Sequence, residues 1–520
     1  MNKVLYLVLS IILLCSCERV LIEEPKAQIS TDFFYQDQDD ALLALTAAYA
    51  QLKRGNGYYK QKFLSSMFAA SDQGLSDFVY GDFKRGTITS TNQNLPITWK
   101  DIYIAIRDAN NVIHHVPDID MDEALKNRII GEARFLRALH YFNLVRCFGE
   151  VPLRIEPIQP GEEEGLPLSS IQDIYEQIIE DLQFASEHCW GRQESREEIT
   201  NDLGRVTNVA AHALLAKVYL RIASAKRTAI EGIEGNRLYM NFPESPEVYY
   251  QLAKEECDKV IGHSDFYLVG SLEEWVELFD ANNGNSEEML FDIQGSTIIG
   301  QGTSVSNLFS PRDAGLSGGG WGGSNKLLPK FINNHLDKND PRYQNSIIRD
   351  YQNTTRSYLI NPGVTGYNVS ITATGEPKGV LWRVFTAKYI DRDATTEYTS
   401  QQNWHVIRLA DVYLMRAEAL AETSQDPAQA NADINQLRNR VEMELFDGAG
   451  MSMDAFRTTI LKERAAELYM EGHRFFDITR MGVYDEVCRI TYGATDGARQ
   501  ANDYFWPIPI TEVAANGNID

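Results

Sequence analysis

A short glycine-rich run contains a pattern that is known from hydrolases. Gly315-Leu316-Ser317-Gly318-Gly319 matches G-x-S-x-G, in which the serine is the nucleophile. That pattern works as a tight turn between a buried strand and a helix, which exposes the serine hydroxyl to the substrate. Here Ser310-Pro311-Arg312-Asp313 precedes the pattern and further glycines follow it, so neither flank is typical of a strand or a helix. We therefore do not expect Ser317 to be catalytic.

Acidic residues recur at helical spacing near the C-terminus. A glycosidase needs two carboxyl groups about 5 to 10 Å apart across the sugar bond that it cleaves, so these residues could serve one. Glu463, Glu467 and Glu471 are each one helical turn apart, however, and Arg464 and Arg474 are near enough to neutralise them. Structural ion pairing is the favoured interpretation of a cluster with these members: Glu463, Arg464, Glu467, Glu471, Arg474, Asp477 and Arg480.

Patterns for metal or phosphate binding are missing from the sequence. It contains no H-E-x-x-H, no G-x-x-x-x-G-K-[ST] and no C-x-x-C pair. His114, His115 and His140 lie in expected helices at spacings that do not converge on a metal. We expect no catalytic residue, no metal site and no cofactor.

The first seventeen residues resemble a bacterial lipoprotein signal. Lys3 precedes an apolar run over residues 4–14, which has signal-peptide length. Leu14-Cys15-Ser16-Cys17 follows, and signal peptidase requires a small residue before the cut. Cys17 is preceded by Ser16 and is the expected lipidation site, whereas bulky Leu14 makes Cys15 a poor acceptor. Residues 1–16 are thus the expected signal peptide and residues 17–25 a lipid-anchored tether, which attaches the protein to a membrane without spanning it.

Composition limits the possible partners. The 520 residues carry a formal net charge of −24, which would repel nucleic-acid phosphates and anionic lipid surfaces. No nucleic-acid partner is therefore expected. No apolar run after residue 20 is long enough to span a bilayer. The remaining cysteines, at 147, 189, 257 and 488, are scattered, and buried free thiols are the expected state.

Helical periodicity dominates residues 26–262 and resumes at Trp404. The pattern predicts helices over 122–148, 171–185 and 453–469. The motif L-A-x-V-Y-L-x-x-A-x-A occurs twice, beginning at Leu215 and at Leu409, and each copy precedes a second helix near 249–261 or 429–441. Small alanines let neighbouring helices approach closely, so the pairs resemble tetratricopeptide units. The predicted fold is mainly α, an α-superhelical scaffold of such pairs.

Residues 263–403 have a different composition. The stretch from Gln294 to Ser324 contains nine glycines and no helical period, and long irregular stretches in a compact protein are usually functional or disordered. Short β-like runs such as 380–389 predict small sheets at most. We expect one domain over residues 26–520, built from a helical scaffold at 26–262 and 404–520 and an irregular insertion at 263–403. The proline-locked run 504–509 is expected to pack on the scaffold as an extended strap.

Taken together, the signal, the helix pairs and the strap resemble the SusD/RagB family of nutrient-binding lipoproteins of Bacteroidetes. The resemblance covers almost everything after Cys17. It rests on the following segments in order: Phe33-Phe34, Trp99-Lys100-Asp101-Ile102-Tyr103, Asn110-Asn111, Gly131–Ala138, Phe148–Leu153, Gly204–Thr207, Arg408–Ala419, Glu463-Arg464, Glu467-Leu468, Gly472–Asp477 and Trp506–Pro509.

The resemblance implies a binding protein and not an enzyme. Such a protein would be lipid-anchored in the outer membrane and face the cell exterior. It would capture oligosaccharides, or less often peptides, for a SusC-like TonB-dependent transporter. Two other hypotheses stay open: a tethered glycoside hydrolase, and a tetratricopeptide-like adaptor that binds only proteins.

Candidate ligand residues lie in the irregular polar loops. Sugar rings present flat C–H faces, so their sites combine aromatic platforms with planar polar groups. Aromatic residues on the helices, Trp99 and Tyr103 among them, are expected in the core. Trp321 is flanked by glycines that would let a ligand reach its ring. The loop over residues 71–94 supplies the other candidates, which are Asp72, Tyr80, Arg85 and Asn92. The family commonly assembles its ligand surface from two such segments, which agrees with this pairing.

Overall fold

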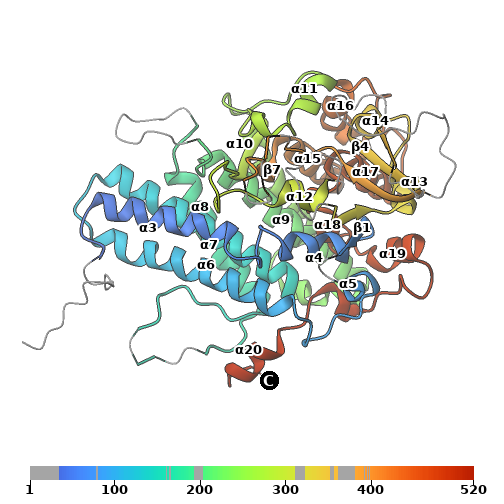
Figure 1. Ribbon diagram of the computed structural model, residues 1–520. Coiled ribbons are helices and arrows are strands. Elements are labelled where there is room, and N and C mark those ends of the chain that lie inside the picture. The colour runs from blue at the N-terminus through green and yellow to red at the C-terminus, as the bar shows by residue number, and fades with distance from the viewer. Residues whose placement is uncertain are drawn as a thin grey trace, which may run out of the picture.

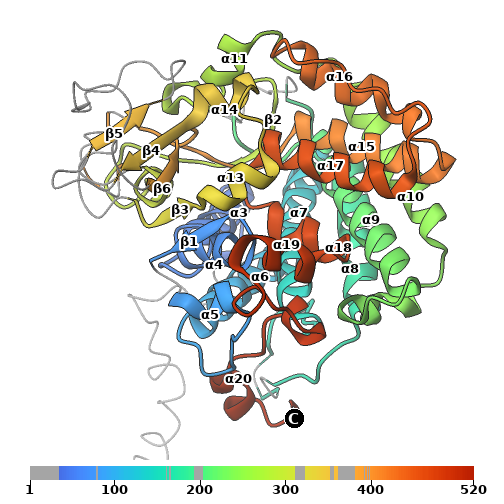
Figure 2. The ribbon, with the colours of Figure 1, turned by 90° about the vertical axis from the view of Figure 1, so that its right-hand side faces the viewer.

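The computed structural model describes residues 34–519 apart from 78–79, 160, 163–164, 193–202, 311–322, 352–356, 361–380, 392, 395 and 397–398. For residues 80, 349–351, 357–360 and 381–383 it describes the backbone alone. Cys15 and Cys17, Ser317 and Trp321 therefore lie outside the described residues. Long helices form most of the molecule, and the strands gather on one side of it (Figure 1; Figure 2).

Eight long helices of the described chain form the scaffold, and each packs against the next. The helix α7 packs against both α6 and α8, and α9 packs on α8. The helix α10 then lies between α9 and α15, which in turn contacts α17. Their bounds are α3 (Gln38–Ala50), α6 (Leu95–His115), α7 (Glu123–Phe148), α8 (Ile171–His188), α9 (Asn208–Ile230), α10 (Pro246–Ile261), α15 (Leu409–Ser424) and α17 (Met453–Leu468). This arrangement confirms the predicted mainly helical, tetratricopeptide-like fold.

Local sequence signals set the ends of α7. The side chain of Asp122 accepts a hydrogen bond from the backbone N–H of Leu125, which satisfies a donor in the first turn. Gly149 ends the helix with a φ of 75°, a conformation that glycine adopts at little cost. The predicted helix over 122–148 is therefore confirmed to within one residue.

The two copies of the repeated motif occupy equivalent places. They lie in α9 and α15, and α10 packs against both helices. The alanines of both motifs are fully buried, and Tyr219 is 7% exposed while Tyr413 is half-buried. The close helix contacts predicted from small residues are thus present. The second helix of the later pair begins as the 3-10 turn η5 (Pro427–Ala430) and continues as α16 (Asn431–Asn439).

The strands form two antiparallel sheets. The larger has the order β1-β3-β6-β4-β5, from β1 (Gly74–Ser76), β3 (Asn325–Leu327), β4 (Ile347–Tyr351), β5 (Ser357–Ile360) and β6 (Leu381–Thr386). The smaller pairs β2 (Met289–Ile293) with β7 (Trp404–Arg408). The prediction that a helix resumes at Trp404 is therefore wrong, because residues 404–408 pair with β2 and the helix begins at Leu409. Trp404 is buried in this strand and stacks on Tyr389 and Phe309.

Short helices connect these parts. They are α4 (Lys62–Ala70), α5 (Tyr80–Arg85), α11 (Leu272–Glu277), α12 (Val305–Phe309), α13 (Pro329–His335), α14 (Pro341–Ser346), α18 (Arg474–Arg480), α19 (Tyr484–Tyr492) and α20 (Ile510–Ala515). The remaining 3-10 turns are η1 (Gln51–Lys53), η2 (Val116–Asp118), η3 (Glu234–Asn241), η4 (Ala281–Asn283) and η6 (Ala501–Tyr504). None of the helices in the described part is both long and apolar enough to cross a membrane.

The C-terminal strap packs on the scaffold as predicted. Trp506 is 2% exposed, and its indole contacts the rings of Phe63, Phe83, Phe148 and Phe475. Its backbone N–H donates to the carbonyl of the residue at 147, so the strap is tied to the end of α7. The four cysteines of the described chain are free and buried, as expected.

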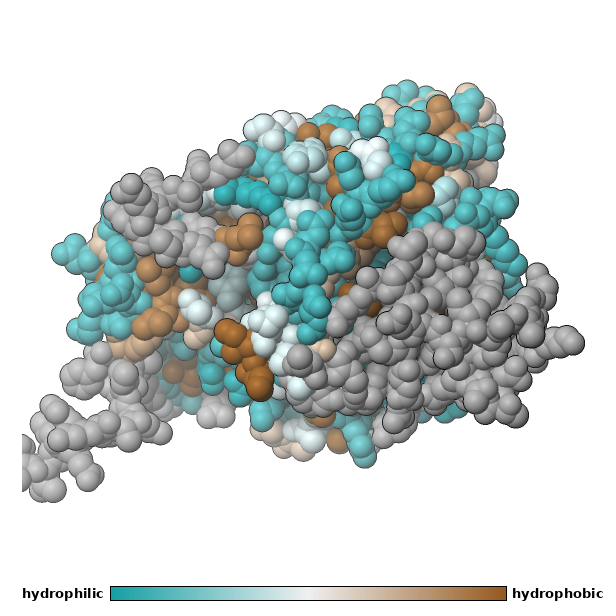
Figure 3. Space-filling model, turned by 45° about the horizontal axis from the view of Figure 1, so that its top comes forward, coloured by the Kyte–Doolittle hydropathy of each residue, from teal (hydrophilic) through white to brown (hydrophobic). Residues whose placement is uncertain are grey.

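On the face drawn in Figure 3, apolar groups are interspersed among hydrophilic residues and do not form one continuous patch.

Candidate functional site

The structure brings the two predicted ligand segments to one sheet edge. Strand β1 comes from the 71–94 loop, β3 follows the glycine-rich run, and the two pair antiparallel with Ser76 opposite Asn325. The backbone N–H of Asp77 donates to the carbonyl of Ser324 at 3.0 Å. The chain after Asp77 and the chain before Ser324 therefore leave the ladder at the same point. Helix α5 begins three residues after Asp77, beside this edge (Figure 2).

Two of the predicted residues, Arg85 and Asn92, both contact the carboxylate of Asp82. Arg85 is the last residue of α5, its side chain is half exposed, and its guanidinium lies 3.5 Å from the carboxylate of Asp82. Asn92 donates from its side-chain amide to the other Asp82 oxygen at 3.3 Å. Tyr80 is the first residue of α5, and only its backbone is described. Sequence reasoning missed Asp82, although its place between an aromatic residue and an arginine in the same polar loop is a usable signal.

Asp72 does not belong to this surface, which corrects its prediction as a ligand residue. Its side chain is fully buried. Its two oxygens accept hydrogen bonds of 2.8 Å from the guanidinium of Arg474, and the His335 ring nitrogen lies 3.1 Å away. Burial opposes ionisation of Asp72, but Arg474 and His335 outweigh it and hold the pKa of Asp72 well below its ordinary value. Asp72 thus ties the loop to α18 and has no surface to offer a ligand.

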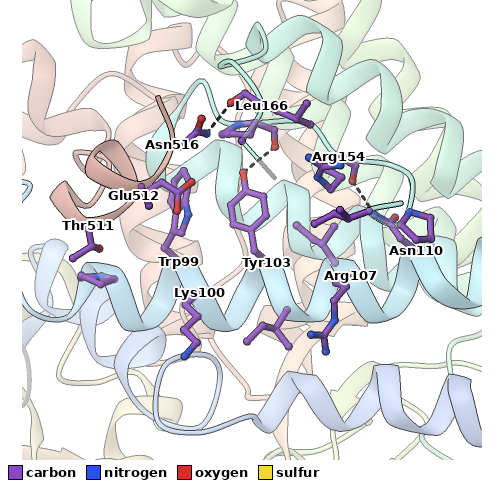
Figure 4. Close-up of a pocket in the computed structure, with 18 of the residues that line it drawn as sticks. Trp99, Lys100, Tyr103, Arg107, Asn110, Arg154, Leu166, Thr511, Glu512 and Asn516 are labelled. Atoms are coloured by element: carbon purple, nitrogen blue, oxygen red, sulfur yellow. Dashed lines mark hydrogen bonds between the residues drawn. The ribbon is translucent and has the colours of Figure 1, made fainter. Parts of the chain in front are cut away.

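A separate cavity of about 540 Å³ opens between α6, the segment after α7 and α20. In Figure 4, Trp99 and Tyr103 rise side by side from α6 toward the opposite wall. Their rings lie 5.0 Å apart at 41°. The cavity is lined by Pro96, Trp99, Lys100, Tyr103, Ile104, Ile106, Arg107, Asn110, Pro152, Arg154, Glu156, Pro157, Ile158, Gly165, Leu166, Thr511, Glu512, Ala515 and Asn516.

Hydrogen bonds from side chains fix the walls of this cavity. Tyr103 donates to the carbonyl of Pro152 at 2.8 Å, and Asn110 donates to that of Arg154 at 3.0 Å. On the α20 side, Asn516 donates to the carbonyl of Leu166 at 2.9 Å (Figure 4). Burial, together with the nearby Tyr141 phenol and the Glu512 carboxylate, raises the pKa of Tyr103 well above its ordinary value, so Tyr103 stays a donor.

The expectation that Trp99 and Tyr103 are core residues is correct only for the first. Both rings line the cavity, but Trp99 is 4% exposed and packs edge-on against Phe148, whereas Tyr103 is half-buried. No sequence signal marked the cavity, because its opposite wall comes from segments about 50 and 400 residues further along the chain. Only the docking of α20 and of the Pro152–Leu166 segment on α6 creates it.

The acidic cluster near the C-terminus is buried and ion-paired, which confirms its structural interpretation. Glu467 is fully buried and accepts hydrogen bonds from Arg342, Arg408 and Arg440. Glu471 accepts from Lys388 and Arg408 at 2.7 Å each. The expected partners were wrong, however: the cations that neutralise the glutamates come from distant segments and not from 464 and 474.

The other charged residues of the cluster join neighbouring elements. Arg464 donates to Asp477 at 2.9 Å, which links α17 with α18. Arg480 binds Glu418 of α15 as well as Asp477. These contacts support the expectation that such residues hold the last helices together. In the described part of the chain, no group of three or more His, Cys, Asp or Glu side chains could hold a metal ion.

The fold is that of the SusD-like proteins, whose solved structures superpose on this chain, and sequence profiles match the same class. A profile described as "SusD family" matches residues 264–520, and one described as "Starch-binding associating with outer membrane" matches residues 23–220. The chain belongs to the SusD/RagB family.

Individual relatives are similar in sequence to this chain over most of its length. A SusD-like protein of Formosa agariphila is 26% identical over 96% of this chain and 94% of its own length. The starch-binding protein SusD of Bacteroides thetaiotaomicron is 25% identical over 76% of this chain and 72% of its own length. Among solved structures, a laminarin-binding SusD-like protein is 27% identical and superposes with a TM-score of 0.71, covering 94% of this chain and 99% of that one.

Proposed function

We propose that this protein binds oligosaccharide or polysaccharide nutrients at the cell surface and passes them to a TonB-dependent outer-membrane transporter. The observation that carries the proposal is its similarity, over 94% of the chain and at 27% identity, to a structure named as laminarin-binding. The similarity to a starch-binding relative points to the same ligand class. Both glycans are glucose polymers, so a glucan is the first ligand to test.

The sheet edge at β1 and β3 is the proposed glycan surface. It joins the partly exposed Arg85 and Asp82, whose planar polar groups match sugar hydroxyls, to the segment that carries Trp321. Asn92 is 8% exposed, and its hydrogen bond holds Asp82 in place. Planar donors and acceptors fix a ring in register, while an aromatic face covers its C–H groups. Tyr80 and Trp321 are the proposed aromatic members.

A lipid on Cys17 would hold the protein at the outer membrane, facing the exterior. The family description "associating with outer membrane" supports that location. A SusC-like transporter is the proposed partner, and with a net charge of −24 we expect a large mixed interface and not electrostatic capture of an anionic surface. Gently solubilised membranes should yield the two proteins together.

A glycan-binding protein and a tethered hydrolase differ in whether the bound glycan is cleaved. The test incubates the purified protein with laminarin, starch and xyloglucan, and measures both binding and the release of reducing ends. Binding with unchanged chain length supports the proposal. Steady release of reducing ends would establish a hydrolase instead, and failure to bind any glycan would leave a protein adaptor as the better hypothesis.

A further inference from the structure

The cavity between α6 and α20 has the features of a ligand site that is separate from the sheet edge. Its volume of about 540 Å³ lies within the range of roughly 300–1,000 Å³ that is usual for small-molecule sites. Its walls are held by the hydrogen bonds to the carbonyls of Pro152, Arg154 and Leu166. A ligand would therefore find the cavity already formed, and little conformational entropy would be lost on binding.

The lining combines aromatic and apolar surface with polar groups that still have bonding capacity. The residues Glu512, on the α20 wall, and Lys100, on α6, make no ion pair or side-chain hydrogen bond within the described part of the chain, and the Lys100 side chain extends from α6 on the side away from Trp99 and Tyr103 (Figure 4). Arg107 is exposed, and among the residues that the structure describes it pairs only with its neighbour Asp108, at 2.7 Å. A purely apolar ligand would leave these groups unused, whereas a sugar chain presents both C–H faces and hydroxyls.

The cavity lies next to the proposed glycan surface. Asn92 and Pro96, which belong to the two sites, are four residues apart, so their Cα atoms are at most about 14 Å apart. The backbone N–H of Ile510, at the start of α20, donates to the carbonyl of Ser90 in the same loop at 2.9 Å. One polymer chain could contact both sites at once.

We infer that this cavity is a second glycan site, which binds a short stretch of the same polymer that the sheet edge binds. The inference rests on the proposed function. Two linked sites make the second contact intramolecular, so long chains should bind more tightly than short ones without any new contact in the first site.

The test blocks the cavity without touching the core. Ala515 on α20 lines the cavity and is exposed, while its neighbour Ala514 is exposed and does not line it. The matched variants are Ala515→Trp and Ala514→Trp, prepared as the full mature protein in lipid nanodiscs. Isothermal titration with gluco-oligosaccharides from laminarin and starch should give two binding sites in the wild type and in Ala514→Trp, and one in Ala515→Trp.

A second variant guards against misfolding of the first. Lys100→Ala combined with Glu512→Ala removes one exposed and one half-buried charged group that line the cavity, and it should weaken binding of the polymer at least tenfold while the melting temperature stays within 2 °C. Unchanged stoichiometry in Ala515→Trp, or unchanged polymer affinity in the double variant, would overturn the second site and leave the proposed function intact. A wild-type protein that binds none of these glucans would refute both. Loss of transporter co-purification in Ala515→Trp with unchanged glucan binding would identify the cavity as a protein contact and overturn the inference.

Discussion

Replacing Glu471 by Gln should destabilise the protein strongly at neutral pH and less at acid pH. Glu471 is fully buried against Lys388 and Arg408, each 2.7 Å from one of its oxygens. Burial raises the pKa of Glu471, but the two cations outweigh this effect and lower it from 4.5 to about 2. A pKa lowered by this amount corresponds to roughly 3 kcal/mol.

A second estimate gives a similar magnitude. Breaking a buried ion pair by removing one partner typically costs about 3–5 kcal/mol, because the remaining charges stay buried without compensation. We therefore expect the free energy of unfolding to fall by about 3–5 kcal/mol in Glu471→Gln at pH 7.

The sign of the pH dependence follows from the lowered pKa. The folded pKa lies below the unfolded value of about 4.5, so the stabilisation is complete above pH 4.5 and is lost as the pH falls toward 2. At pH 3.5, about one unit into this window, the difference in unfolding free energy between wild type and variant should be roughly 1 kcal/mol smaller than at pH 7.

Urea denaturation followed by circular dichroism at pH 7 and pH 3.5 measures both effects. Glu234→Gln is the matched control, since Glu234 is two-thirds exposed and paired with exposed Arg237, and it should change stability by less than about 0.5 kcal/mol. Two results would refute the account of the buried cluster. One is an equal loss of unfolding free energy in the two variants, and the other is a loss in Glu471→Gln that is the same at pH 7 and pH 3.5.

Three further predictions concern the anchor, the ligand surface and the strap. Cys17→Ala should move the protein from the membrane fraction to an unanchored or unprocessed form, whereas Cys15→Ala should fractionate as wild type; normal membrane recovery of the first would disprove the anchor. Trp321→Ala should cost about 1–3 kcal/mol of affinity for the bound glucan, by analogy with planar ligands on aromatic platforms, with the melting temperature nearly unchanged. Unaltered affinity, or a collapse of stability, would make that residue structural. Trp506→Ala should cost about 3–5 kcal/mol of stability, because the indole fills a site between four other rings, and a loss below 1 kcal/mol in denaturation would show that the strap is not needed for the fold.

Tertiary structure decided which of the candidate residues lie at the surface. Asp72 and Arg85 come from the same polar loop, and composition does not distinguish them. Asp72 is buried because Arg474 approaches it from 402 residues away, whereas Arg85 lies at the free end of a short helix. Similarly, local propensity predicts a helix at Trp404–Arg408. The segment forms a strand instead, because β2 supplies an edge with which it can pair.

The sequence alone predicted a structural feature correctly where the residues that cause the feature lie within a few positions of it. The start and end of α7 follow from Asp122 and Gly149, and the repeated alanine motif specifies two equivalent helices. By contrast, the arginines that pair with Glu467 come from 27 to 125 residues away, and the cavity exists because α20 docks on α6. Caps and helical periods act over one or two turns of the chain. Ion pairs and cavities depend on which helices pack together, and the energy that selects this packing is spread over the whole buried core.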